Sequence, residues 1–205
     1  MKEDKVIEEE KPFFFPRLIA FIIDSILVFI ISVGLVSIIP ADPNHAKYVK
    51  ELESIQTGMV SNEIGTKEYV NKIKDVVYDL DHTNVLVSLA QVVIYIGYFT
   101  LFQYKNKGQT FGKKLMKLKV VSTNTKELSL NQVAIRTLIC NSIFINLLLV
   151  ACVLFMGRDY YYYATFSLQI LNYGIIIVAL FMILFRKDGK GLHDLVAKTK
   201  VVNAN

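Results

Sequence analysis

Tryptophan is absent from this 205-residue sequence, and cysteine, histidine and proline are scarce, with two, three and four residues respectively. The cysteines, Cys140 and Cys152, are twelve residues apart, which matches neither a CxxC redox motif nor a zinc-ligand spacing. His193 precedes Asp194, but the other two histidines are expected on the opposite side of a membrane. We therefore predict no metal site and no cofactor.

Catalytic motifs are missing as well. The segment GQTFGK at residues 108–113 is one residue shorter than the phosphate-binding loop GxxxxGK[ST], and it lacks the Ser or Thr that would hold magnesium. It also follows an apolar block and not the strand of a βα unit. Since no nucleophile is paired with a base elsewhere, we predict that the protein is not an enzyme.

The pattern of a cleaved secretory signal is also lacking. The opening residues, MKEDKVIEEEKP, are mixed to acidic, the apolar run after them is too long for a signal peptide, and no small-residue cleavage site follows it. We expect the first apolar block to be a retained helix.

Apolar residues are abundant, at 53% of the sequence, and the mean hydropathy is +0.41. They gather into blocks of about 20 residues, the length that a helix needs to cross the hydrocarbon core of a bilayer. We predict an all-α integral membrane protein with one domain, a four-transmembrane-helix bundle. The predicted spans are residues 17–39, 84–104, 133–155 and 166–185.

Positive charge is distributed unevenly over the segments outside these spans. Residues 105–132 hold seven lysines, and the arm 1–16 and the tail 186–205 are also basic, whereas the outer loop 156–165 holds only Arg158. Because basic loops stay in the cytoplasm, we predict a multi-pass plasma-membrane protein with both termini cytoplasmic. The net charge of +5 then complements the anionic head groups of the lipid bilayer, and we expect no nucleic-acid partner.

Two connecting segments carry patterns of their own. The extracytoplasmic loop 40–83 has apolar residues at helical spacing in two stretches, the second opening at Thr66 as an N-cap. These two helices either cover the bundle or form a lid or docking surface. In the cytoplasmic loop 105–132, an amphipathic helical stretch precedes strand-like residues 119–122, which we expect to pair with residues 199–203 in a small antiparallel β element.

A carboxylate stands inside the first predicted span. Asp24 follows Arg17 by seven helical positions, so the two lie on nearly the same face but roughly 10 Å apart along the axis. Arg17 belongs at the interface, where Asp194 is a candidate partner. Asp24 needs a donor from another helix, because a charge in hydrocarbon costs several kcal/mol unless it is paired or hydrated, and this makes it a functional candidate.

Four amide side chains are candidate donors to Asp24. By a rise of about 1.5 Å per residue, Asn141 lies about as deep in its span as Asp24, and Gln91, Asn146 and Asn172 lie nearer the midplane. Together they form either interhelical hydrogen bonds or the path of a ligand or ion. The sequence leaves both interpretations open.

Three motifs resemble those of the RDD family of small membrane proteins: PRLIAFIID, QTFGKKLMKLKVV with a following Arg136, and LHDLVAKTKVV. The family is named for an arginine and two aspartates, which match Arg17, Asp24 and Asp194, and Gly112 and Arg136 belong to the same motif set. The loop 40–83 lies outside the resemblance, and Lys198 departs from it, since similar proteins tend to have a small residue there. The resemblance implies a multi-span domain suspected of transporting unidentified ligands, with sodium/proton antiport proposed for some relatives.

Two functions follow from these residues. In the first, the protein transports ions or small ligands, with Asp24 as a proton- or cation-binding carboxylate. Because we detect no internal repeat, such a transporter is expected to be a homo-oligomer. In the second, it is a non-transporting accessory or regulatory subunit that binds another membrane protein, and Arg17, Asp24 and Asp194 are architectural.

Overall fold

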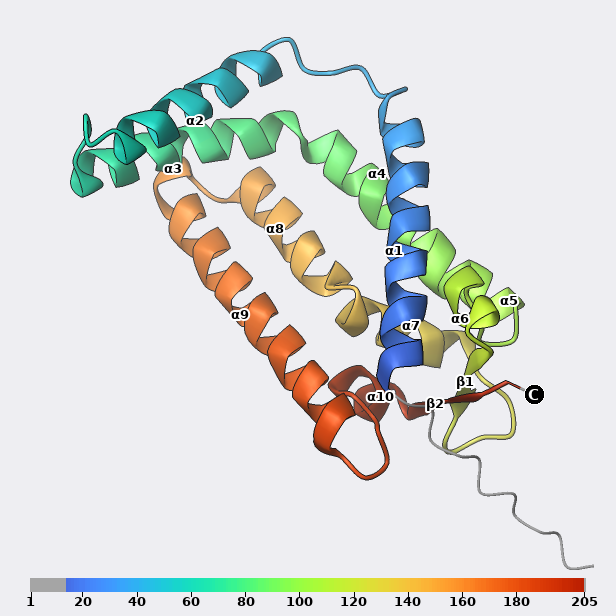
Figure 1. Ribbon diagram of the computed structural model, residues 1–205. Helices are drawn as coiled ribbons and strands as arrows, with labels where there is room; N and C mark the ends of the chain where they lie inside the picture. Colours follow the sequence, from blue (N-terminus) through green and yellow to red (C-terminus); the bar gives the residue numbers. More distant parts are fainter. Residues whose placement is uncertain (1–13, 205) are drawn as a thin grey trace, which may run out of the picture. The chain divides into compact units, whose positions relative to one another are not determined.

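The computed structural model describes residues 14–204, and most of the predicted arm 1–16 lies outside them. The described chain divides into two compact units. We call the first the sheet unit; it comprises residues 14–31, 94–141 and 175–204. We call the second the hairpin unit; it comprises residues 32–93 and 142–174. Each is described by itself (Figure 1).

Three helical segments are long and apolar enough to cross a membrane. They are α1 (Phe14–Val36), the continuous segment Val85–Lys105, and α9 (Arg158–Phe185). The middle segment comprises α4 (Val85–Ile96), the π-helix η1 (Gly97–Phe102) and α5 (Gln103–Lys105). A bent pair, α7 (Leu130–Cys140) and α8 (Ile143–Phe155), brings the number to four if it forms one span. A largely helical membrane protein is confirmed, with three or four candidate spans.

The third predicted span, 133–155, is not one straight helix. Its two halves, α7 and α8, meet at an angle of 66°. The break falls at Asn141 and Ser142, and Ser142 has a φ of 55° in the left-handed region. Residues other than glycine pay a steric cost there, and the helical hydrogen-bond ladder is interrupted. Because the block is largely apolar throughout, its sequence pattern does not predict this break.

The fourth span also differs from its predicted bounds. Helix α9 begins at Arg158 and not at residue 166, so Met156 and Gly157 alone separate it from α8. The tyrosines of the predicted outer loop 156–165 are helical, because no residue after Gly157 breaks the helix.

The predicted β element is present in the sheet unit. Strand β1 (Leu118–Ser122) pairs antiparallel with β2 (Thr199–Asn203), with Val120 opposite Val201. Leu118, Val120 and Val201 form a small core with Ala20 of α1. Helix α6 (Phe111–Leu115) precedes β1, and α10 (Leu192–Ala197) precedes β2. Two loops far apart in the sequence are thus joined beside the start of α1.

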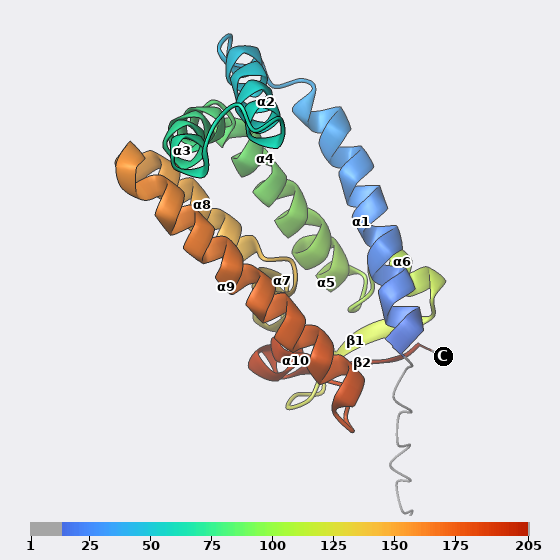
Figure 2. The same cartoon turned by 60° about the vertical axis from the view of Figure 1, so that its left-hand side comes forward.

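The hairpin unit is built on α2 (His45–Val60) and α3 (Thr66–Thr83), which lie side by side (Figures 1 and 2). Ile55, Ile73 and Val76 form the core between them. The two helices agree with the predicted spacing, but the N-cap of α3 is Gly65, and Thr66 is the first helical residue. The apolar faces predicted for these two helices therefore pack against each other.

Ion pairs and hydrogen bonds join α3 to the start of α9 within the hairpin unit. Arg158 Nη2 lies 2.5 Å from Asp79 Oδ1, and the Tyr161 hydroxyl donates to Asp81 at 2.7 Å. Burial raises the pKa of Asp81, and the bond from Tyr161 opposes that shift.

Candidate functional site

The Asp24 carboxylate is buried in the sheet unit, with only 1% of its surface exposed. The hydroxyl of Tyr98 donates to Oδ1 at 2.6 Å, and the backbone N–H of Gly112 donates to the same atom at 2.7 Å. The hydroxyl of Thr110 donates to Oδ2 at 2.5 Å. A carboxylate offers about four acceptor positions, so most of those on Asp24 are occupied by the second span and the loop after it.

The π-helix η1 places Tyr98 beside Asp24. Single π-turns inside α-helices re-aim side chains and are frequent at functional sites. The Tyr98 hydroxyl also accepts from the Phe111 N–H at 3.1 Å, so it bridges α1 and α6. In the same turn, the carbonyl of Phe99 accepts from the Thr137 hydroxyl of α7 at 2.9 Å. This turn therefore connects three elements of the sheet unit.

Gly112 allows α6 to approach α1 closely. A Cβ atom at this position would overlap the carbonyl oxygen of Ala20 and lie 3.0 Å from both Cγ and Oδ1 of Asp24. Only glycine lets its N–H reach the carboxylate without moving the helix. Gly112 of the motif QTFGKK thus has a steric role.

The ammonium group of Lys113 lies among three oxygen atoms. Its Nζ is 3.2 Å from Thr110 Oγ1, 3.5 Å from Gln103 Oε1 and 4.0 Å from Asp24 Oδ2. Burial lowers the pKa of Lys113 to about 8, and the positive charge of Arg136 lowers it further, while Asp24 opposes the shift. A lysine with such a pKa exchanges its proton near physiological pH.

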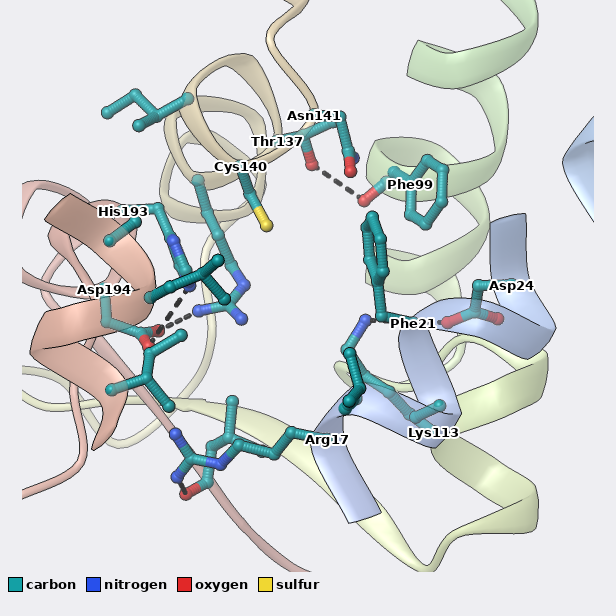
Figure 3. A pocket seen from close by; sticks show the side chains of 18 of the residues that line it. Arg17, Phe21, Asp24, Phe99, Lys113, Thr137, Cys140, Asn141, His193 and Asp194 are labelled. Atoms are coloured by element: carbon teal, nitrogen blue, oxygen red, sulfur yellow. Dashed lines mark hydrogen bonds and ion pairs between the residues drawn. The ribbon is translucent and has the colours of Figure 1, made fainter. Parts of the chain in front are cut away.

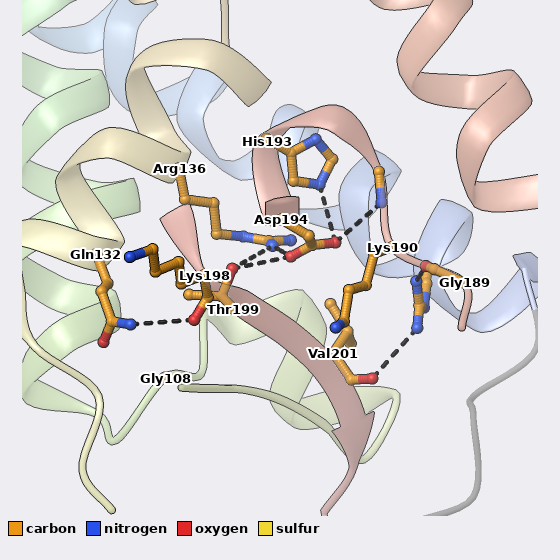
Figure 4. Close-up of polar contacts among 12 residues, drawn as sticks. Gly108, Gln132, Arg136, Gly189, Lys190, His193, Asp194, Lys198, Thr199 and Val201 are labelled. Atoms are coloured by element: carbon orange, nitrogen blue, oxygen red, sulfur yellow. Dashed lines mark hydrogen bonds and ion pairs between the residues drawn. The ribbon is translucent and has the colours of Figure 1, made fainter. Parts of the chain in front are cut away.

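A second buried carboxylate, Asp194, lies at the start of α10 and is 1% exposed. It forms an ion pair with Nη1 of Arg136 and accepts from the Thr199 hydroxyl at 3.0 Å and the Gly191 N–H at 3.3 Å (Figure 4). His193 Nε2 is 3.4 Å from Oδ2, the oxygen that also accepts from the Gly191 N–H, whereas Arg136 and Thr199 contact Oδ1. Burial lowers the pKa of His193 well below 6.5, and nearby cations add to the effect, so this imidazole is neutral at physiological pH.

Arg17 does not pair with Asp194, its candidate partner in the sequence analysis. Its Nη1 donates to the Gly189 carbonyl at 2.5 Å and its Nη2 donates to the Val201 carbonyl at 3.2 Å. The partner of Asp194 is Arg136, from another motif of the family pattern. Arg17 therefore connects α1 to the tail through backbone carbonyls.

The four candidate amides do not donate to Asp24. Asn141 lines the same cavity as Asp24 without a hydrogen bond to it, and Gln91, Asn146 and Asn172 belong to the hairpin unit. The donors are instead Tyr98, Thr110 and Gly112, none of which is among the four predicted amides. Thr110 and Gly112 lie in the motif QTFGKK, which is the sequence feature that indicates them as donors. Ranking candidate donors to Asp24 by their depth along straight helices fails here.

A cavity of about 310 Å³ lies within the sheet unit (Figure 3). Asp24 lies on one side of it, and His193 and Asp194 lie on the other. Its lining brings together the candidate residues Arg17, Asp24, Arg136, Asn141 and Asp194. Among residues 14–204, no group of three or more His, Cys, Asp or Glu side chains is arranged to hold a metal ion.

A family model matches most of this chain. Neither curated proteins nor solved structures provide a similar sequence or fold. The model of the RDD family matches residues 11–198. This range includes the first two motifs and most of the third, together with Arg17, Asp24 and Asp194, whereas Thr199 and Val201 lie just beyond it. The chain belongs to the RDD family.

Proposed function

We propose that this membrane protein exchanges a monovalent cation, such as Na⁺, for a proton at Lys113 and Asp24. The observation that carries the proposal is the position of the Lys113 ammonium group among the oxygens of Asp24, Thr110 and Gln103. An ammonium ion there occupies the place that a small cation would take. Hard cations favour carboxylate, hydroxyl and amide oxygens of this kind.

Exchange at this position conserves charge. When Lys113 releases its proton, the neutral amine no longer needs the three oxygens, and the negative charge of Asp24 attracts one cation in its place. Rebinding of a proton by Lys113 expels that cation. Three donors point at the Asp24 carboxylate and hold it in place as the cation ligand, while Lys113 carries the proton.

Proton flux in proteoliposomes tests this function. We expect a Na⁺- or K⁺-dependent flux that rises as the pH rises through about 8, because Lys113 must lose its proton to admit the cation. Asp24→Asn abolishes the flux. Lys113→Arg lowers it at least about tenfold, because arginine stays protonated, whereas Lys114→Arg at the exposed neighbouring position leaves it unchanged.

Two results would contradict the exchange mechanism. One is equal flux from the wild type and Asp24→Asn, and the other is no flux from the folded wild type with any monovalent cation. Thermal unfolding of each variant in detergent separates a lost cation site from a lost fold. Chemical cross-linking in the same liposomes measures whether the active form is the homo-oligomer that the lack of a repeat favours.

The alternative function is that of a non-transporting accessory subunit of another membrane protein. The observation in its favour is that both buried carboxylates join separate elements: Asp24 joins α1 to η1 and α6, and Asp194 joins α10 to α7 and β2. Purification from native membranes distinguishes the two. Recovery of a stoichiometric second protein together with a silent flux assay supports the accessory function, and recovery of this chain alone contradicts it.

A further inference from the structure

The cavity of the sheet unit has an apolar wall that none of the polar contacts above uses. It is formed by the C-terminal half of α9, with Ile176, Ala179, Leu180 and Ile183, and by Leu18 and Phe21 of α1. These helices belong to candidate membrane spans. An apolar wall of this kind favours contact with an apolar part of a ligand.

The opposite side of the cavity has positive charge and unused hydrogen-bond donors. Arg136 is 8% exposed and uses only Nη1 for its contacts with Asp194 and Thr199. The Nε atom of Arg17 is buried and, within residues 14–204, has no hydrogen-bond partner. With Lys113, three cationic side chains line the cavity against two carboxylates, Asp24 and Asp194. The site therefore favours an anion.

We propose that this cavity binds one acyl chain that carries an anionic head group. The head group lies against the unused donors of Arg136, with the positive charge of Arg17 nearby, and the chain lies along the wall of α1 and α9. A volume of about 310 Å³ is at the small end of the range for ligand pockets and suits a single chain. The contacts of the head group and chain are separate from those of Lys113, while the excess of positive charge in the cavity holds when Lys113 is protonated.

The same chemistry has two sources, a free fatty acid and one chain of an anionic phospholipid, and Cys140 reports on both. Cys140 lines the cavity, and Cys152 lies in the hairpin unit; each is half-buried. The full chain is placed in phosphatidylcholine nanodiscs, alone, with phosphatidylglycerol, or with oleate. Alkylation of both thiols by N-ethylmaleimide is then followed by mass spectrometry.

We expect an anionic amphiphile to slow alkylation of Cys140 several-fold relative to Cys152. Protection by phosphatidylglycerol assigns the chain to a phospholipid, and protection by oleate alone assigns it to a fatty acid. Equal Cys140 rates in all three bilayers overturn the proposal. Native mass spectrometry provides a second readout that does not depend on thiol reactivity: one bound phosphatidylglycerol or oleate is expected per chain, and none overturns the proposal.

A cavity-filling variant and a neighbouring control separate the site from general bilayer effects. Ala179→Phe places a ring on the apolar wall and is expected to abolish both the bound amphiphile and the lipid dependence of the Cys140 rate. Val178→Phe changes the adjacent residue, which is 50% exposed and does not line the cavity, so it is expected to keep both. Unchanged amphiphile binding in Ala179→Phe contradicts the assignment to this cavity.

Discussion

At the scale of single residues, α6 can approach the backbone of α1 closely because Gly112 has no Cβ atom. The close approach is needed because the Gly112 N–H donates to Asp24 at 2.7 Å. The hydroxyls of Tyr98 and Thr110 depend on the same approach, since they reach the carboxylate from η1 and from the N-cap of α6. A change of one methyl group at Gly112 therefore affects all three donors to Asp24.

Substitution of Gly112 by alanine is expected to destabilise the sheet unit. The new Cβ overlaps the Ala20 carbonyl, and overpacking of this kind costs about 1–3 kcal/mol. The measurement is the thermal unfolding midpoint in detergent, which is expected to fall. Gly34→Ala in α1 is the control, because no atom beyond its chain neighbours and the nearby backbone of its own helix lies within 4 Å of its Cβ position, and its midpoint is expected to stay equal or rise. Equal midpoints for Gly112→Ala and the wild type would contradict the steric role.

The two buried carboxylates also show that residue identity alone does not determine which residues form ion pairs. The sequence identified Arg17, Asp24 and Asp194 as important, but it offered Asp194 only as a candidate partner of Arg17. The structure pairs Asp194 with Arg136, 58 positions away. Proximity of two charges to one membrane interface is too weak a criterion, because every basic residue near that interface satisfies it.

At the scale of elements, the end of α10 turns the chain into β2 through Lys198. This residue has a φ of 54° and a ψ of 51°, in the left-handed region that glycine adopts without steric cost. Its carbonyl accepts from the Thr123 N–H and from the Gln132 amide, so the turn also fixes the sheet against α7.

Lys198→Gly is expected to stabilise the protein by about 1 kcal/mol, since the cost of a Cβ in the left-handed region is removed. The contacts of the Lys198 carbonyl remain, because they involve only the backbone. Lys198→Ala keeps the Cβ and is expected to give no gain. The thermal unfolding midpoint measures both variants, and a larger gain from alanine than from glycine would show that the backbone conformation is not the cause.

The elements themselves were largely predictable from local patterns. The two outer helices and the pairing of residues 119–122 with 199–203 follow from apolar spacing and strand propensity. The bend between α7 and α8 and the π-turn η1 were not predictable in this way. Both interrupt an apolar block without changing its composition, since Asn141 and Ser142 alone mark the bend and no residue marks the π-turn.

At the scale of the whole molecule, the sheet constrains how the chain crosses a membrane. Strands β1 and β2 are hydrogen-bonded partners, so they lie on the same side, and α9 and the bent pair α7–α8 are the apolar segments between them. If α9 crosses once, the bent pair has to cross as well. We therefore expect four crossings and both chain ends on the side of the sheet, which positive charge predicts to be cytoplasmic.

Single cysteines in a Cys140→Ser, Cys152→Ser background test this topology. A membrane-impermeant maleimide applied to intact cells is expected to label Thr57→Cys in α2, and to label Lys126→Cys and Lys187→Cys only after permeabilisation. All three side chains are exposed, so reagent access depends on the side of the membrane alone. Labelling of Lys126→Cys and Lys187→Cys from opposite sides would contradict an even number of crossings between β1 and β2.

The sequence by itself determined the class of the protein, its apolar segments and the residues that the family shares. Backbone groups in hydrocarbon have to satisfy one another within a helix, so long apolar blocks allow little else. Only the tertiary structure decided the partners of those residues. Asp24 meets Tyr98, Thr110 and Gly112 across 74 to 88 positions of sequence. These contacts depend on a loop that folds back onto α1. Local sequence patterns do not predict against which element such a loop packs.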